Sequence, residues 1–82
     1  MFMLPDRDGH VRVRANVAGE VEIRATVGQV ILSGQILAVV EGDKEIESLS
    51  VRKASRVLEI LVEDGREVDE GTALMVVEEL AD

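Results

Sequence analysis

Residues 28–41 read GQVILSGQILAVVE, and residues 65–78 repeat that pattern as GREVDEGTALMVVE. The offset between the two segments is a constant 37 residues. Both glycines, the β-branched residue midway between them, a leucine, a Val-Val pair and the closing glutamate coincide. Agreement of this kind at a fixed offset indicates an internal repeat. The chain therefore contains two related units.

Each unit contains the spacing Gly-x-x-β-x-x-Gly, where β is a β-branched residue. Glycine adopts the positive φ of many tight turns without the steric cost that other residues meet. The spacing predicts a very short strand with a tight turn on either side of it.

Hydrophobic alternation predicts strands in the rest of the chain. Residues 11–14 alternate between valine and arginine, which is the period of two expected of a half-buried strand. Residues 36–40 are apolar on both faces, as in a strand that is covered on both sides. Further extended segments are predicted at residues 21–27, 46–51, 57–62 and 73–77. No segment has helical periodicity between caps, so the chain is predicted to be all-β.

Two repeats are too few for a solenoid, which needs about three units to bury a continuous core. Two short β units can instead cover each other and form a small sandwich with approximate two-fold symmetry. The link between the units, around residues 42–45, is then a hairpin at one end of the sandwich. The two chain ends are expected together at the opposite end.

The composition excludes several classes of function. The chain has 82 residues, enough for one domain, and a formal charge of −8. It has no cysteine, one histidine (His10) and one aromatic residue (Phe2), which argues against a disulfide framework, a catalytic triad, a metal centre and base stacking. No apolar run approaches the roughly 20 residues of a membrane helix, and no signal peptide is indicated. We expect a cytoplasmic protein that is not an enzyme, with no nucleic-acid or membrane partner.

The negative charge is concentrated in residues 55–82, which hold nine acids and two arginines. A solvated acidic face would account for this segment, because surface charge of one sign keeps a protein soluble. A docking surface for a basic partner is the alternative.

The layout of these residues resembles the biotinyl/lipoyl attachment domain family. The resemblance runs through Gly28-x-x-Ile31-x-x-Gly34-x-x-Leu37, then Val39-Val40-Glu41-x-Asp43-Lys44, then Val57 and Gly65-x-x-Val68-x-x-Gly71. It covers one domain over about residues 11–79, preceded by a lead-in over residues 1–10. It implies an all-β fold, a flattened β-sandwich (barrel-sandwich hybrid) of two four-stranded sheets with an internal pseudo-two-fold repeat.

In that family a lysine at the tip of the central hairpin carries a covalently attached lipoyl or biotinyl group. Lys44 falls on this position, and the only other lysine is Lys53. A primary amine on a long flexible stem suits such a place. The resemblance implies a carrier domain in which modified Lys44 is a swinging arm that shuttles intermediates between active sites, with no catalytic residue and no metal site of its own.

The residues before Lys44 favour lipoate as the cofactor. An acid three residues before the lysine (Glu41) and an aspartate directly before it (Asp43) are common in lipoyl domains, whereas biotinyl domains typically flank the lysine with methionine. Biotin is the alternative, because residues 34–37 also suit biotinyl carriers. The implied partners are a lipoate or biotin protein ligase, which would recognise Glu41 and Asp43, and a multienzyme complex such as a 2-oxo acid dehydrogenase, or the subunits of a biotin-dependent carboxylase.

Three residues depart from the pattern of the family. Glu45 replaces the usual small or apolar residue after the lysine and alters the face that a ligase would read. This leaves open an unmodified adaptor module with the same fold. Ser55 stands where a glycine normally begins the second half, and Asn16 where proline is common. Both are expected to affect turn geometry only.

Two different registers are predicted for the hairpin turn. Turn chemistry alone centres a two-residue turn on Gly42 and Asp43, with glycine first as in a type II′ turn. The resemblance instead places the turn at Asp43 and Lys44. Lys44 is exposed in either register, but it lies at the apex only in the second.

Overall fold

The computed structural model describes residues 9–81. This part of the chain forms eight strands and no helix, and so contains no helix that could span a membrane. In chain order the strands are β1 (His10–Arg14), β2 (Gly19–Ile23), β3 (Val30–Ile31), β4 (Ile36–Glu41), β5 (Ile46–Ser50), β6 (Ser55–Ile60), β7 (Glu67–Val68) and β8 (Ala73–Glu79).

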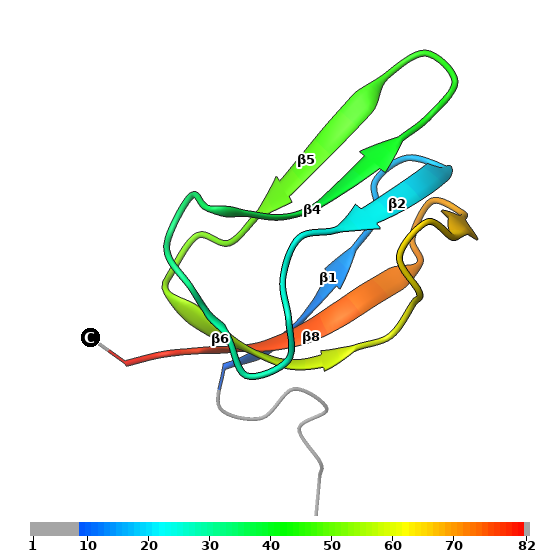
Figure 1. Cartoon of the computed structure of the whole chain (residues 1–82). Coiled ribbons are helices and arrows are strands. Elements are labelled where there is room, and N and C mark those ends of the chain that lie inside the picture. Colours follow the sequence, from blue (N-terminus) through cyan, green and yellow to red (C-terminus); the bar gives the residue numbers. More distant parts are fainter. Residues whose placement is uncertain (1–8, 82) are drawn as a thin grey trace, which may run out of the picture.

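The strands form two four-stranded antiparallel sheets that face each other as a flattened sandwich (Figure 1). One sheet has the order β1-β8-β6-β3, and the other has the order β5-β4-β2-β7. The prediction of an all-β sandwich of two four-stranded sheets is confirmed. Residues 1–8 of the predicted lead-in lie outside the described residues, and β1 begins at His10.

The two halves of the chain are interleaved. Exchanging β1 with β5, β2 with β6, β3 with β7 and β4 with β8 converts the strand order of one sheet into that of the other. Backbone hydrogen bonds follow the same exchange: the Gly28 N–H donates to the Val57 carbonyl, and the Gly65 N–H donates to the Val21 carbonyl, both at 2.7 Å. The pseudo-two-fold repeat is therefore present. Each sheet takes two strands from each half, so neither half has a sheet of its own.

Small apolar side chains fill the space between the sheets. The core consists of Ala15, Val21, Ala25, Ile31, Leu37, Ala38, Val40, Leu49, Val51, Val57, Val68, Leu74, Met75 and Val77. Within residues 9–81 the one buried polar residue is Ser55, and its hydroxyl donates to the Lys53 carbonyl at 2.8 Å. The buried hydroxyl is thus satisfied, as stability requires. Ser55 contributes a packed hydrogen bond as well as turn geometry.

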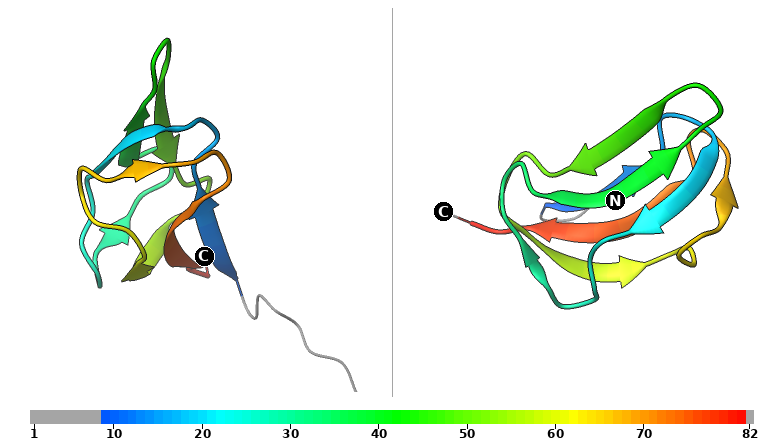
Figure 2. Two further views of the ribbon diagram at one scale, coloured as in Figure 1. Left: turned by 90° about the vertical axis from the view of Figure 1, so that its right-hand side faces the viewer. Right: turned by 45° about the horizontal axis from the view of Figure 1, so that its top comes forward.

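The pseudo-two-fold relates the turn of the β4–β5 hairpin to the place where the start of β1 meets the end of β8. The Gly42 N–H donates to the Glu45 carbonyl at 2.8 Å, and the Glu79 N–H donates to the Gly9 carbonyl at 2.9 Å. The hairpin projects from one end of the sandwich, and β8 runs out at the other (Figure 1 and the right-hand view of Figure 2). The two ends of the described domain therefore meet opposite the hairpin, as predicted, and the residues beyond them at the chain ends lie outside the described residues.

Replacing either Leu37 or Leu74 by alanine should lower the free energy of unfolding by about 2–5 kcal/mol, because each change leaves a cavity in the core. The two positions are equivalent and both fully buried, so the two losses should be similar. Urea denaturation followed by circular dichroism measures them. Leu32→Ala is the control, since Leu32 is 62% exposed, and it should cost under about 0.5 kcal/mol. A large loss at one core leucine and none at the other would contradict equivalent packing.

Candidate functional site

The turn between β4 and β5 is centred on Asp43 and Lys44. The hydrogen bond from the Gly42 N–H to the Glu45 carbonyl closes this two-residue turn. Gly42 does not have the positive φ that a type II′ turn beginning at this residue needs. The register expected from turn chemistry alone is therefore wrong, and the register of the family is present. Lys44 lies at the apex of the hairpin.

Lys44 is exposed, as are Asp43 beside it, Glu45 after it and Glu41 at the end of β4. None of the ion pairs within residues 9–81 involves Lys44. No contact of this kind holds its amine against the surface in this part of the chain. The side chain can therefore reach into the site of another protein.

Two glycines let the β1–β2 loop approach the base of the hairpin closely. A Cβ atom on Gly19 would lie 2.2 Å from the carbonyl oxygen of Glu41. A Cβ atom on Gly42 would lie 2.8 Å from the carbonyl oxygen of Ala18. Glycine is thus needed at position 42 because the backbone of Ala18 lies close to it, and not because the turn requires a positive φ there. The contact fixes β4 against β2 at the base of the hairpin that carries Lys44.

A side-chain link holds β5, the other strand of the hairpin. The Glu47 carboxylate accepts a hydrogen bond from the backbone N–H of Asn16 (2.9 Å) and another from the Asn16 side-chain amide. Proline, which is common at the position of Asn16 in the family, has no N–H to donate. Asn16 therefore does more than shape a turn, contrary to the expectation from sequence.

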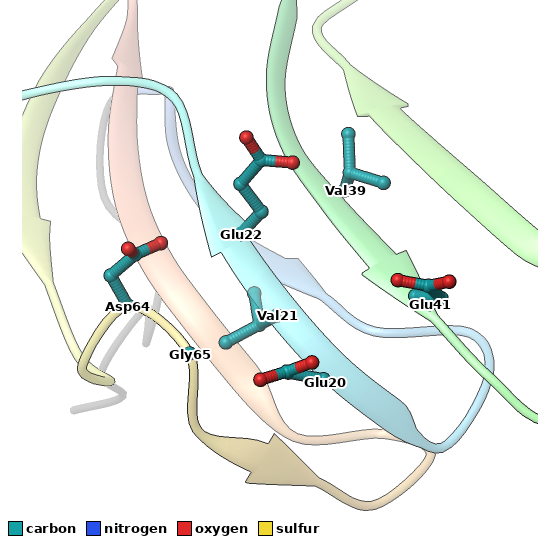
Figure 3. A pocket seen from close by; sticks show the side chains of 7 residues that line it. All are labelled: Glu20, Val21, Glu22, Val39, Glu41, Asp64 and Gly65. Carbon is teal, nitrogen blue, oxygen red and sulfur yellow. The ribbon is translucent and has the colours of Figure 1, made fainter.

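The outer face of the sheet that bears the hairpin is acidic. Glu20 on β2 lies opposite Glu41 on β4 and opposite Glu67 on β7. Glu20 and Glu41, with Glu22 and Asp64, line an open hollow on this face (Figure 3). Like charges at directly opposite strand positions destabilise a sheet. No group of three or more His, Asp or Glu side chains in residues 9–81 is arranged to hold a metal ion.

The equivalent row on the other sheet has mixed side chains: Arg56 on β6 lies opposite Glu78 on β8 and opposite Val30 on β3. The His10 Nε2 on β1 is 4.0 Å from the Glu78 carboxylate. The backbone is equivalent in the two rows, so the acidic row depends on side chains alone. Two of its three glutamates, Glu20 and Glu41, belong to the first half of the chain. Counting charge along the sequence therefore did not reveal this row.

Comparison with known proteins identifies the family. The family model described as a biotin-requiring enzyme, the biotin/lipoyl attachment domain, matches residues 11–77. The chain belongs to this family. The predicted family is confirmed, and domains of this family are carriers rather than catalysts. No curated protein matches the chain.

Solved structures with the same fold include two carboxylases. A single-chain, multi-domain long-chain acyl-CoA carboxylase is 30% identical, with a TM-score of 0.81 over 98% of this chain and 8% of that chain. The urea carboxylase of Kluyveromyces lactis is 20% identical, with a TM-score of 0.75 over 94% of this chain and 7% of that chain. A putative succinylglutamate desuccinylase/aspartoacylase from Shewanella frigidimarina is 19% identical, with a TM-score of 0.75 over 89% of this chain and 21% of that chain. The last two likenesses show the fold alone, and the chain spans only a small part of each protein.

Sequence reasoning located Glu41, Asp43 and Lys44 on the hairpin, where the structure has them. It missed Gly19 and Glu47, which hold the two strands of that hairpin. Glu47 was one acid among several, and its contact with Asn16 joins residues 31 positions apart. The one available signal was an asparagine at a position where the family commonly has proline.

Gly19→Ala should lower the free energy of unfolding by about 3 kcal/mol or more, because the new methyl group would overlap the Glu41 backbone. Gly34→Ala is the control: Gly34 has a φ of 82° but open space around its Cβ position, so only backbone strain of about 1 kcal/mol is expected. Urea denaturation measures both variants. Equal losses would show that Gly19 is not required by the contact.

Proposed function

We propose that this chain is a biotinyl carrier domain in which Lys44 holds a covalently attached biotinyl group and carries a carboxyl group between the active sites of a carboxylase. The proposal depends on the exposure of Lys44 at the apex of the projecting hairpin. Membership of the biotin/lipoyl family supports this proposal, because the family attaches its cofactor to a lysine at the tip of this hairpin. The similarity to a long-chain acyl-CoA carboxylase supports a carboxyl group as the cargo.

The attachment reaction requires only the amine of Lys44 from this chain. A ligase presents the carboxyl group of the cofactor as an acyl adenylate. The unprotonated Nζ attacks the acyl carbon, an amide bond forms, and the acyl–phosphate bond breaks so that adenosine monophosphate leaves with the bonding electrons. The nitrogen then loses a proton to solvent. The product has lost the lysine charge and has a longer stem, so the domain transports the group without catalysing its transfer.

Lipoate is the second candidate cofactor, and Asp43 is the observation that favours it. An aspartate directly before the lysine is the pattern of lipoyl domains, and Glu41 three residues before it agrees with that pattern. In this case the chain would serve a multienzyme complex. We place biotin first because the 30% identical neighbour is a carboxylase, which transfers the group that biotin carries.

An unmodified adaptor module is a third candidate from a different class. Glu45 is the residue that favours it, because an exposed carboxylate directly after Lys44 changes the surface that a ligase contacts. The fold and the hairpin would then serve only to bind a partner.

The proposal names two kinds of partner. The first is a biotin protein ligase, or a lipoate ligase for the second candidate, which contacts the hairpin. Glu41 and Asp43 precede Lys44 and are exposed, so they are the residues that this ligase would recognise. The subunits or domains of the carboxylase bind the modified domain afterwards. We further propose that these events take place in the cytoplasm.

The intact mass of the protein purified from its native cells should show the increment of one biotinyl group. Lys44→Arg should abolish the increment while the urea midpoint stays the same, because an exposed arginine keeps the charge but is not acylated. Lys53→Arg is the matched control and should retain the increment in full. An increment that survives Lys44→Arg would place the modification elsewhere.

Incubation with biotin ligase, biotin and ATP should add one biotinyl group to Lys44, whereas lipoate ligase with lipoate should add none. Asp43→Met should raise the rate of biotinylation, since methionine beside the lysine is the pattern of biotinyl domains. Mass spectrometry of both reactions provides the measurement. A lipoyl increment alone would establish the second candidate, and no increment with either ligase would establish the adaptor.

A further inference from the structure

The hairpin that carries Lys44 extends beyond most of the sandwich (Figure 1). Its outer strand β5 is an edge strand that pairs only with β4. Near the tip, Ile46 on this strand is 66% exposed. The strand therefore has little core packing where it approaches Lys44. Beyond its pairing with β4, a side-chain contact is what can fix its direction.

The link from Glu47 to Asn16 supplies this contact. Glu47 lies opposite the buried Val40, so its side chain leaves the sheet on the inner face rather than toward the outer surface. There both carboxylate oxygens accept a hydrogen bond from the same residue, one from its backbone and one from its side chain. A charged acceptor with two donors forms a stronger and more directional link than a neutral pair.

The internal two-fold provides a comparison within the molecule. The equivalent of Glu47 at the opposite end is Val11, because Val11 lies opposite Val77 just as Glu47 lies opposite Val40. The equivalent of Asn16 is Arg52, because the preceding residues, Ala15 and Val51, accept equivalent hydrogen bonds from Gly71 and Gly34. No hydrogen bond joins Val11 to Arg52. Val11 instead borders an apolar hollow between the sheets.

Arg52 at that end bonds Glu79 on β8 at 3.3 Å, so no side chain ties the edge strand β1 to the equivalent loop. The strand pairing is nevertheless the same at the two ends. The fold thus does not itself require the Asn16–Glu47 link, and the link is found only at the end that bears Lys44.

We propose that Asn16 and Glu47 are positioning residues for Lys44, which hold the hairpin in the one direction that a modifying or acceptor enzyme receives. This inference rests on the proposed function. A hairpin fixed in advance loses less conformational freedom when it enters a partner site. Glu47 lies on β5 three residues after Lys44, which is in the turn that leads into this strand, so a restraint at Glu47 acts close to the turn.

The first measurement is hydrogen exchange at two amides. The Gly42 N–H reports the closing of the tip, and the Gly28 N–H, bonded to Val57, reports the sandwich. Glu47→Ala should speed exchange at Gly42 about tenfold relative to Gly28, because a charge-assisted link is lost. Asn16→Ala, which keeps its backbone N–H, should have a smaller effect. Val11→Ala, at the position equivalent to Glu47, is the control and should leave the ratio unchanged.

The second measurement is kcat/KM for modification of Lys44, at a temperature where every variant is folded. Glu47→Ala and Asn16→Ala should both lower it, and the double variant should be no slower than Glu47→Ala, because both changes break one link. Val11→Ala should be modified at the wild-type rate.

Three outcomes would overturn the positioning role. If the exchange rate at Gly42 is unchanged in Glu47→Ala, the link does not restrain the hairpin. Slower modification with unchanged exchange, or additive losses in the double variant, would show that Glu47 contacts the ligase directly. Failure of the proposed function is recognised separately, because neither ligase would then modify the wild-type chain. The positioning role would then also be wrong, even if hydrogen exchange at Gly42 changes as expected.

Discussion

Main-chain hydrogen bonding between the two halves is the constraint on which the rest of the structure depends. The first half supplies β2 and β4, the centre of one sheet, and β1 and β3, the two edges of the other. The second half supplies the complementary set. Neither half can satisfy its backbone or bury its apolar face alone, so the duplicated units have to fold together. Most contacts are therefore distant in sequence, which favours slow folding.

The same constraint creates a single distinctive end. Because the β4–β5 turn is equivalent to the place where Gly9 meets Glu79, one end of the sandwich has a continuous hairpin, and at the other end β1 begins and β8 ends with no turn between them. An exposed lysine at the continuous end is carried by two paired strands rather than by a free chain. The close approach of Gly19 on one side and the Glu47 link on the other then fix that hairpin from both of its strands.

The strand pattern and the internal repeat predicted an all-β sandwich with a two-fold, and the family resemblance added its division into two four-stranded sheets. The valine and arginine alternation of residues 11–14 and the doubled glycine spacing predicted strands and turns, and the offset of 37 residues predicted the two-fold. Family resemblance, rather than any local pattern, singled out Lys44. It also gave the correct turn register where turn chemistry failed, because glycine at position 42 is required by a contact with Ala18 and not by its own φ.

Features that depend on partners distant in sequence were not predictable. The acceptor of the Ser55 hydroxyl, Lys53, is only two residues away, but the burial of Ser55 depends on its pairing with Ile31 and Glu79. The Asn16–Glu47 link depends on how a loop meets an edge strand. The row of Glu20, Glu41 and Glu67 exists only once three strands are in register. No single segment of sequence specifies these neighbours, since each requires the relative placement of two elements.

The equivalence of Gly9 and Glu79 with Glu45 and Gly42 has a consequence for the shape of related molecules. A two-residue bridge from Glu79 to Gly9, in place of the residues outside them, would reproduce the turn geometry of residues 42–45, with the paired strands β8 and β1 as its stems. Such a cyclic or permuted chain would present a second arm pointing away from the first. The duplicated scaffold therefore has room for two arms, and this chain builds one.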